Sequence, residues 1–303
     1  MKHVVVGGAG FIGSNLVDQL IAEGHEVIVI DNFSTGKREN LNPNATVLDL
    51  DMSDISNNDI FIKNMINVDT VFLLAAKARV QPSIINPMEY EMNNTLGTLN
   101  MLKCANDAKV RRLVYSASSS AYGDSQILPL NESFNVNPLS PYGAQKYYGE
   151  VMCKVFAQVY NLETVSLRYF NVYGERQNLD GAYALVMGIF SHQRLNNKPM
   201  TIRGDGEQRR DFTYVGDVVN ANILASQSAK VGKGEVINIG NGDNRSINQI
   251  ADMIGGERVY IDPVVEPLET LADNSLAKKL LGWEPTQRIE DWVPIYKKEI
   301  GLE

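Results

Sequence analysis

The chain has 303 residues, of which 44% are hydrophobic and 21% charged, an ordinary composition for a globular protein with a substantial core. Its formal net charge of −8 argues against partners with a strongly negative surface, so we expect no nucleic-acid partner and no attachment to an anionic membrane. No apolar run approaches the length of a membrane-spanning helix, and no signal peptide is evident, so we expect a cytoplasmic protein.

A glycine-rich turn follows the first expected strand, residues 2-6. Its glycines stand at three-residue spacing: Gly7, Gly10 and Gly13. Glycine here allows a tight reversal, lets the backbone approach a pyrophosphate, and lets the helix expected at 11-23 pack closely on the sheet. Because free N–H groups at a helix start favour phosphates, we assign the turn to a dinucleotide, with Phe11 and Ile12 in the same site. A purely structural turn is the alternative.

The second expected strand, 26-30, leads into Asp31, which stands 18 positions after Gly13. A carboxylate at this place accepts hydrogen bonds from the adenosine ribose hydroxyls and repels a 2′-phosphate. We therefore expect NAD rather than NADP as the cofactor. The residues assigned to the same site after this acid are Asn32, Ser34 and Gly36.

Strands and helices alternate through the first half of the chain. Further β-type runs lie at 46-48, 70-74, 112-116 and 163-168, and helical patterns at 84-107 and 142-160. Such alternation predicts an α/β fold with a Rossmann-type, doubly wound parallel sheet, whose ligands bind at the carboxyl ends of the strands.

The pattern loosens after about residue 170, where glycine, proline and asparagine become frequent. We expect 1-170 to form an NAD-binding Rossmann domain, together with a return segment at about 213-240. The remaining stretches, 171-212 and 241-303, are expected to form a smaller C-terminal region that binds the substrate.

A tyrosine and a lysine stand four residues apart at the start of the helix expected at 142-160. Ser140 and Pro141 precede them, and proline favours the first helical turn. The spacing places Tyr142 and Lys146 on one helix face. The ammonium group would then lower the pKa of the tyrosine, and the positive nicotinamide ring of bound NAD would lower it further, so we expect Tyr142 to act as a general base near neutral pH. An exposed pair without a catalytic role is the alternative.

A cluster of serines follows the strand expected at 112-116. Ser118, Ser119 and Ser120 lie where the carboxyl end of that strand meets the expected ligand site. A serine hydroxyl both donates and accepts hydrogen bonds, so it can pass a proton between a substrate and Tyr142. A serine-rich turn without a function is the alternative.

Other short motifs are spread along the chain. They are Asp51-Met52, Leu74-Ala75-Ala76, the Asn94 to Thr98 segment, Tyr122-Gly123, the Arg168 to Gly174 segment and the Gln208 to Asp211 segment. With the glycine turn and the Tyr-Lys pair, they resemble the extended short-chain dehydrogenase/reductases that act on nucleotide sugars, most closely the UDP-glucose 4-epimerase-like branch. The resemblance covers nearly all of the chain.

The resemblance implies a role for each matching residue. The catalytic residues are Ser118, Tyr142 and Lys146. The cofactor site gains Asp51, Met52, Leu74, Ala75, Ala76 and Asn94, besides Tyr142 and Lys146. The implied substrate-binding residues are Arg79, Ser118, Ser119, Tyr142, Asn171, Arg203, Arg210 and Thr270.

The implied reaction is the reversible 4-epimerisation of a UDP-sugar, UDP-glucose or UDP-galactose, through a transient 4-keto intermediate with tightly bound NAD. Family 4,6-dehydratases carry Asp-Glu after the catalytic hydroxyl, and UDP-glucuronate decarboxylases keep the glutamate, whereas this chain has Ser119 and Ser120. The alternatives are a UDP-glucuronate 4-epimerase, a reductase, a dehydratase, and a non-catalytic NAD-binding sensor.

The chain departs from the family pattern in two places, the stretch around residues 263-265 and position 73. Counted back from Ala272 and Asp273, the arginine that clamps the phosphate is replaced by Pro263, and a glycine by Val265. Leu73 stands where many relatives have histidine, which we expect to change only packing. The candidates to replace the missing phosphate contact are Arg176, Arg203 and Arg209.

The resemblance also bears on specificity. The residue two positions before the Ala-Asp pair is the family's gate, and here it is Thr270. A small gate residue admits a 2-acetamido group, so N-acetylated UDP-sugars are expected as further substrates. A UDP-glucuronate substrate is a further alternative, because Arg79 would pair with its carboxylate.

Three further expectations concern the oligomeric state, the cysteines and metal binding. Relatives pair two helices from each subunit, which here implies a homodimer through 84-107 and 142-160. Cys104 and Cys153 lack metal-ligand spacing and are expected to be buried free thiols. No metal site is expected, because the three histidines lie outside the motifs.

Overall fold

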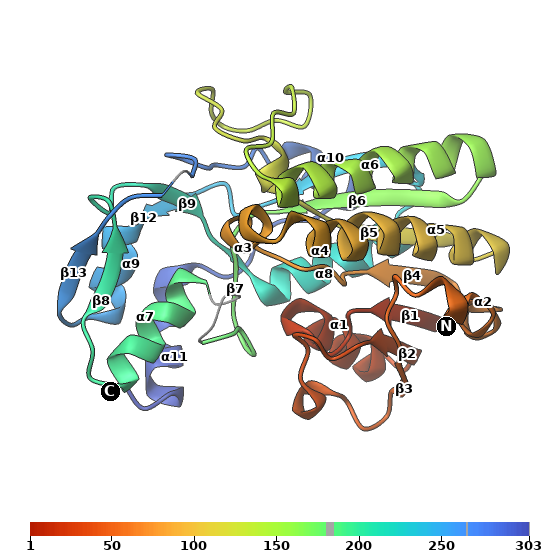
Figure 1. The fold of residues 1–303 in the computed structure, drawn as a ribbon, viewed down its shortest axis with the longest axis horizontal. Helices are drawn as coiled ribbons and strands as arrows, with labels where there is room; N and C mark the ends of the chain where they lie inside the picture. Colours follow the sequence, from red (N-terminus) through yellow and green to blue (C-terminus); the bar gives the residue numbers. More distant parts are fainter. Residues whose placement is uncertain (180–184, 265, 303) are drawn as a thin grey trace.

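A computed structural model describes residues 1–179, 185–264 and 266–302. Its centre is a seven-stranded sheet in the order β11-β6-β5-β4-β1-β2-β3, in which every neighbouring pair is parallel (Figure 1). The strands are β1 (Lys2–Val6), β2 (Glu26–Asp31), β3 (Thr46–Asp49), β4 (Thr70–Leu73), β5 (Arg112–Ser118), β6 (Glu163–Tyr169) and β11 (Lys233–Ile239). The expected Rossmann-type fold is confirmed, and the sheet receives its seventh strand from the segment that we expected to return.

Both faces of this sheet are covered by helices, which explains why its strands are continuous apolar runs. Within β1, Val5 enters one core, while Val4 and Val6 enter the other. The first core also contains residues of α1 (Phe11–Ala22), α8 (Val215–Gln227) and α10 (Ser275–Leu281). The second contains residues of α2 (Asn58–Met65), α5 (Gly97–Asp107) and α6 (Pro141–Tyr160).

A smaller region with its own apolar core lies beside the carboxyl ends of the strands, at the left of Figure 1. It contains the helices α7 (Val186–Leu195), α9 (Ile247–Ile254) and α11 (Ile289–Glu299). Its short strands pair β8 (Met200–Arg203) with β13 (Arg258–Ile261), and β9 (Arg209–Asp211) with β12 (Asn244–Ser246). A further pair, β7 (Val172–Tyr173) and β10 (Thr213–Tyr214), adjoins the main sheet. The division into two domains stays a proposal.

The helix expected over 84-107 is wrong as a single element. The chain instead forms α3 (Val80–Ile85), α4 (Pro87–Glu91), a π-helical turn η3 (Met92–Leu96) and then α5. Proline lacks an N–H and disfavours the helical conformation of the residue before it. Asn86, which precedes Pro87, accordingly leaves the helical region with φ −125° and ψ 61°. Single-turn 3₁₀ helices occur at η1 (Arg38–Asn40), η2 (Ile55–Asn57) and η4 (Ser119–Ala121).

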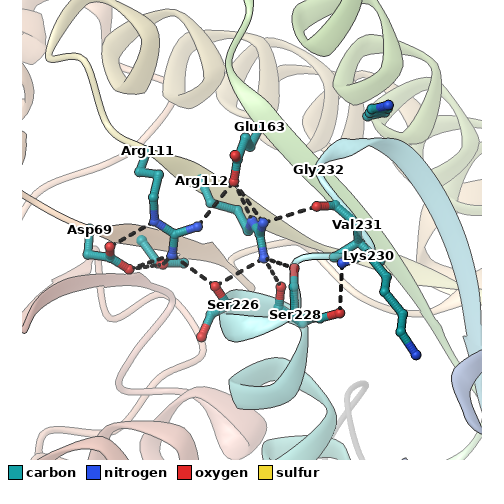
Figure 2. Close-up of polar contacts among 12 residues, drawn as sticks. Asp69, Arg111, Arg112, Glu163, Ser226, Ser228, Lys230, Val231 and Gly232 are labelled. Carbon is teal, nitrogen blue, oxygen red and sulfur yellow. Dashed lines mark hydrogen bonds and ion pairs between the residues drawn. The ribbon is translucent and has the colours of Figure 1, made fainter. Parts of the chain in front are cut away.

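Two adjacent arginines, Arg111 and Arg112, form polar contacts at the amino-terminal edge of the sheet (Figure 2). Arg112 is buried and donates to the carbonyl oxygens of Ala225 (2.7 Å) and Ser228 (2.9 Å), which lie at the carboxyl end of α8. Cations and donors are favoured at a helix carboxyl end, where carbonyl groups lack helical partners. Arg111 pairs with Asp69 (2.7 Å), and the hydrogen bonds from Arg111 hold the pKa of that carboxyl down at about 2.

The two cysteines, Cys104 and Cys153, are buried and free, as the sequence predicted. Burial raises the pKa of Cys104 to about 11 and that of Cys153 to about 12, so both stay protonated at neutral pH. Among the described residues, no helix is long and apolar enough to span a membrane.

Candidate active site

A cavity of about 750 Å³ opens at the carboxyl ends of the central strands, between the sheet and the smaller region. The position is the one expected for a ligand in an open parallel sheet. Most of the predicted site residues line it. They are Gly7, Gly10, Phe11, Ile12, Gly13, Asp31, Asn32, Ser34, Met52, Leu74, Ala75, Ala76, Arg79, Ser118, Ser119, Tyr142, Lys146, Asn171, Arg203, Arg210 and Thr270.

The glycine turn after β1 is packed too closely to hold side chains. A Cβ at Gly7, whose φ is +87°, would lie 2.6 Å from the backbone nitrogen of Ala75. A Cβ at Gly13 would lie 2.1 Å from the carbonyl oxygen of Gly7. Gly10 then caps α1 with its extended backbone and leaves the first N–H groups of the helix facing the cavity. The turn therefore leaves its backbone accessible to a pyrophosphate.

Asp31 lies at the end of β2 and is held by the backbone. Its carboxylate accepts hydrogen bonds from the N–H groups of Ala9 (2.9 Å) and Phe33 (2.8 Å). Burial raises the pKa of Asp31, and these two hydrogen bonds oppose that change. A Cβ at Gly36 would lie 2.9 Å from the Asp31 oxygen Oδ1, so glycine keeps room beside the carboxylate. A rigid acid that borders the cavity fits the ribose of a dinucleotide.

Three predicted cofactor residues, Gly36, Asp51 and Asn94, are not among the cavity-lining residues. Asp51 accepts a hydrogen bond from the Asn32 amide at 2.8 Å. Asn94 is buried, accepts from the backbone N–H of Lys77 (2.8 Å) and donates to its carbonyl oxygen (3.0 Å). These residues therefore hold the wall in place. Lys77 itself lines the cavity and was missed, since it belongs to no recognised motif.

The side chains predicted to be catalytic come from β5 and α6. Ser140 caps α6 by accepting from the N–H of Gly143 at 3.1 Å, and Pro141 occupies the first helical turn, as predicted. Ser118, at the end of β5, accepts hydrogen bonds from the hydroxyl (2.8 Å) and backbone N–H (3.2 Å) of Ser120. These local contacts aim Ser118 and Tyr142 into the same cavity.

The expected effect of Lys146 on Tyr142 is wrong for this structure. Burial raises the pKa of Tyr142, and the influences that lower it are a hydrogen bond with Ser118 and the charge of Arg79. The Lys146 ammonium instead donates to the carbonyl oxygen of Ser116 at 2.7 Å. Burial lowers the pKa of Lys146 to about 7, so the lysine itself needs a negative neighbour to keep its proton.

Arg79 borders the same part of the cavity from an unusual backbone conformation. Its φ of +100° lies in a region that side chains rarely adopt, and such strain concentrates at functional sites. Arg79 precedes α3, and Ser83 of that helix accepts the backbone N–H of Tyr142 at 3.2 Å. Burial lowers the pKa of Arg79 to about 10. Arg79 therefore adds positive charge near the reacting end of the cavity.

The far wall of the cavity carries the residues predicted to hold the nucleotide sugar. The hydroxyl oxygen of Thr270 accepts the backbone N–H of Asp211 at 3.3 Å, and Asn171 donates to the Asp211 carbonyl oxygen at 3.4 Å. Arg210 pairs with Glu266 at 2.6 Å. Glu266 also lines the cavity and was not among the predicted site residues.

Of the three arginines considered as replacements for the phosphate clamp, only Arg203 lines the cavity. Arg176 pairs with Asp18, and Arg209 donates to Asn244, so both are directed elsewhere. Val265, the expected glycine position, lies outside the described residues.

Comparison with known proteins agrees with this geometry. The model of the NAD dependent epimerase/dehydratase family matches residues 3–240. A UDP-glucose 4-epimerase of Mycolicibacterium smegmatis is 36% identical, over 94% of each chain.

Two solved structures are similar over the whole chain. A UDP-glucose 4-epimerase of Thermotoga maritima, crystallised with UDP-glucose, has a TM-score of 0.94, with 38% identity and full coverage of both chains. A UDP-N-acetylglucosamine 4-epimerase of Methanobrevibacter ruminantium, in complex with UDP-N-acetylmuramic acid, has a TM-score of 0.92 with 36% identity over 100% of this chain and 99% of that one. With its glycine turn, cavity and family match, the chain belongs to the NAD dependent epimerase/dehydratase family.

Proposed function

We propose that this protein catalyses the reversible 4-epimerisation of UDP-sugars with tightly bound NAD. The proposal rests on one cavity that is lined by two groups of residues. The first group is the glycine turn with Asp31, and the second is Ser118, Tyr142 and Lys146. The first group would hold a dinucleotide so that its reactive ring could reach the second group. The chemistry that NAD supplies when bound is a reversible hydride transfer at the C4 carbon of the sugar.

The side chains of the chain handle the proton and the charge. Tyr142 takes the proton of the C4 hydroxyl as general base and returns it when the ketone is reduced. Ser118 shares a hydrogen bond with Tyr142 and orients the reacting hydroxyl. Arg79 offsets the negative charge on the phenolate, which burial would otherwise disfavour. Lys146, whose ammonium lies at the cavity wall, would contact the ribose of the bound cofactor.

The serines after Ser118 favour epimerisation over elimination. A dehydratase needs an acid to expel water and a base to remove the C5 proton, and the chain has hydroxyls at Ser119 and Ser120 where that branch carries Asp-Glu. The remaining groups support oxidation and reduction at C4 only. The 4-keto sugar must turn over between the two steps, so the nucleotide has to be the fixed part. Arg203 and Arg210 line the cavity, and their positive charges support a role in binding its diphosphate.

For the sugar, we propose UDP-glucose and UDP-galactose, with the N-acetylated forms admitted past Thr270. Threonine leaves space that a tyrosine would fill, and its hydroxyl is held by the N–H of Asp211. Arg79 favours a second candidate, a UDP-hexuronate, because its buried positive charge would complement a carboxylate on the sugar.

The test is incubation of the purified protein with UDP-glucose, UDP-N-acetylglucosamine and UDP-glucuronate, without added cofactor. We expect each accepted sugar to reach an equilibrium with its C4 epimer, followed by chromatography or NMR, and NAD to be released on denaturation. Accumulation of a 4-keto product would contradict the epimerase proposal. Recovery of NADP would contradict the role of Asp31.

We also propose that the protein is a homodimer. Apolar side chains on α3, α4 and η3 are exposed beside α6, including Ile85 and Met88, each 74% exposed. On α6 itself, Val151 and Val159 are exposed. Light scattering at micromolar concentration should give twice the chain mass. Met88→Lys should weaken the dimer, while Ile127→Lys, an exposed position outside these helices, serves as the control; a monomeric wild type would contradict the proposal.

A further inference from the structure

A buried ion pair lies one helical turn beyond Lys146 and takes no part in the proposed reaction. Glu150 of α6 accepts two hydrogen bonds from Arg168 of β6, Nε to Oε1 at 2.8 Å and the second guanidinium nitrogen to Oε2 at 2.7 Å. The side chains are 2% and 3% exposed, respectively. The guanidinium carbon also lies 4.5 Å from the ring centroid of Tyr122.

Stability alone is a weak reason for such a pair. Removing two charges from water is costly, and apolar residues of similar volume are often as stabilising. A buried pair next to a catalytic group therefore calls for a role in that site. Its nearest functional neighbour on the same helix face is Lys146, four residues before Glu150.

The pair decides what Lys146 can contact. A lysine and a glutamate at this spacing readily form an ion pair on a helix. Here both oxygens of Glu150 are engaged by Arg168, and the Lys146 ammonium donates to the Ser116 carbonyl at the cavity wall. Without Arg168, the carboxylate would be the strongest acceptor within reach of the lysine.

We propose that Glu150 and Arg168 are positioning residues for Lys146, and this inference rests on the proposed catalytic role of that lysine. Arg168 holds Glu150 away from the lysine, so that the ammonium stays at the cavity. Glu150 keeps a negative charge one turn behind the ammonium, so that the buried lysine keeps its proton.

The charges around Lys146 agree with this arrangement. Burial lowers its pKa to about 7, and the main opposing influence is the charge of Glu150, followed by Cys153 on the same helix. From β5, the ring of Tyr115 lies 5.1 Å from the ammonium. Tyr142 faces the cavity from the same helix as Lys146.

The two single substitutions should move the pKa of Lys146 in opposite directions. Arg168→Met frees Glu150 to pair with the lysine, so the pKa should rise while kcat falls by roughly tenfold or more, with KM little changed. Glu150→Gln leaves an uncompensated guanidinium near the lysine, so the pKa should fall and the alkaline limb of the pH profile should move to lower pH. Charge alone gives these two signs, so the fall in kcat at unchanged KM, in a variant that melts like the wild type, is the result that a purely structural pair would not produce.

The measurement is trace acylation of Lys146 against pH, read by mass spectrometry, which needs no turnover and so stays separate from the proposed function. Arg112→Met is the matched control, because it removes another buried arginine of the sheet from a carboxylate, Glu163, at the opposite edge. It should lower stability and leave the pKa of Lys146 in place. The double variant Glu150→Gln/Arg168→Met should bring the pKa back toward the wild-type value.

If Arg168→Met does not fold, Arg168→Lys is the alternative. It keeps a positive charge beside the Glu150 carboxylate, so the pKa of Lys146 should rise by less than in Arg168→Met. Thermal melting verifies that each labelled variant is folded. Equal pKa values for Lys146 in wild type, Glu150→Gln and either Arg168 variant would overturn the inference, whatever the epimerase assay shows.

Discussion

The two edges of the parallel sheet use arginine in different ways. At the amino-terminal edge, Arg111 and Arg112 bind carboxylates and helix carbonyls, and the protein itself satisfies them (Figure 2). At the carboxyl edge, Arg79, Arg203 and Arg210 line the cavity, and Arg210 also pairs with Glu266. Arginine thus stabilises the fold where the strands begin, and we propose that it binds a ligand where they end. The polarity of a parallel sheet creates this division, because all its strands end at one edge.

Tyr142→Phe, at the carboxyl edge of the sheet, should cause the largest loss of activity. The substitution keeps the ring and removes the hydroxyl that carries the proton, so kcat should fall by ~10²–10⁴-fold with little change in stability. Turnover of UDP-glucose and thermal melting check both halves. Retention of more than about a tenth of kcat would mean that another group is the base.

At the amino-terminal edge, Arg112→Met should lower the stability of the protein and leave its activity unchanged. The carbonyl oxygens of Ala225, Ser228 and Val231 lose this donor, and Glu163 keeps its contact with Arg111, so we expect a loss of about 3 kcal/mol in the free energy of unfolding. Denaturant unfolding measures this loss. The folded variant should retain kcat, and a selective loss of activity would contradict the division between the two edges.

Thr270→Tyr should change the substrate specificity of the cavity. The larger ring should reduce kcat/KM for UDP-N-acetylglucosamine by at least ~10-fold and leave UDP-glucose nearly unchanged. Thr270→Ser is the control, because it keeps a small side chain that can accept the N–H of Asp211. Equal losses on both sugars would show that Thr270 is not the gate.

Arg111→Met should have the smallest effect and one that depends on pH. Because Arg111 lowers the pKa of Asp69 to about 2 in the folded state, its stabilising contribution is present above the unfolded pKa near ~3.9 and disappears as pH falls toward 2. The pair is partly exposed, so the loss at neutral pH should be about 1 kcal/mol or less. Unfolding at pH 7 and pH 3 measures it; an equal difference at both would contradict the linkage.

Local patterns were enough to predict much of this protein. The glycine turn, Asp31 and the helix that carries Tyr142 and Lys146 were readable because each depends on neighbours within a few residues. The order of strands and helices predicted the sheet for the same reason. The interrupted helix at 84-107 was missed although Pro87 marks the break, because its apolar spacing continues across the proline.

Contacts between distant segments were decided only by the tertiary structure. The sequence places Lys146 beside Tyr142, yet the fold directs its ammonium to Ser116 and brings the charge of Arg79 to bear on the tyrosine. Likewise, Arg168 meets Glu150 across a strand and a helix. Burial and charge depend on everything that packs around a group, whereas spacing along one helix sets only which side chains share a face.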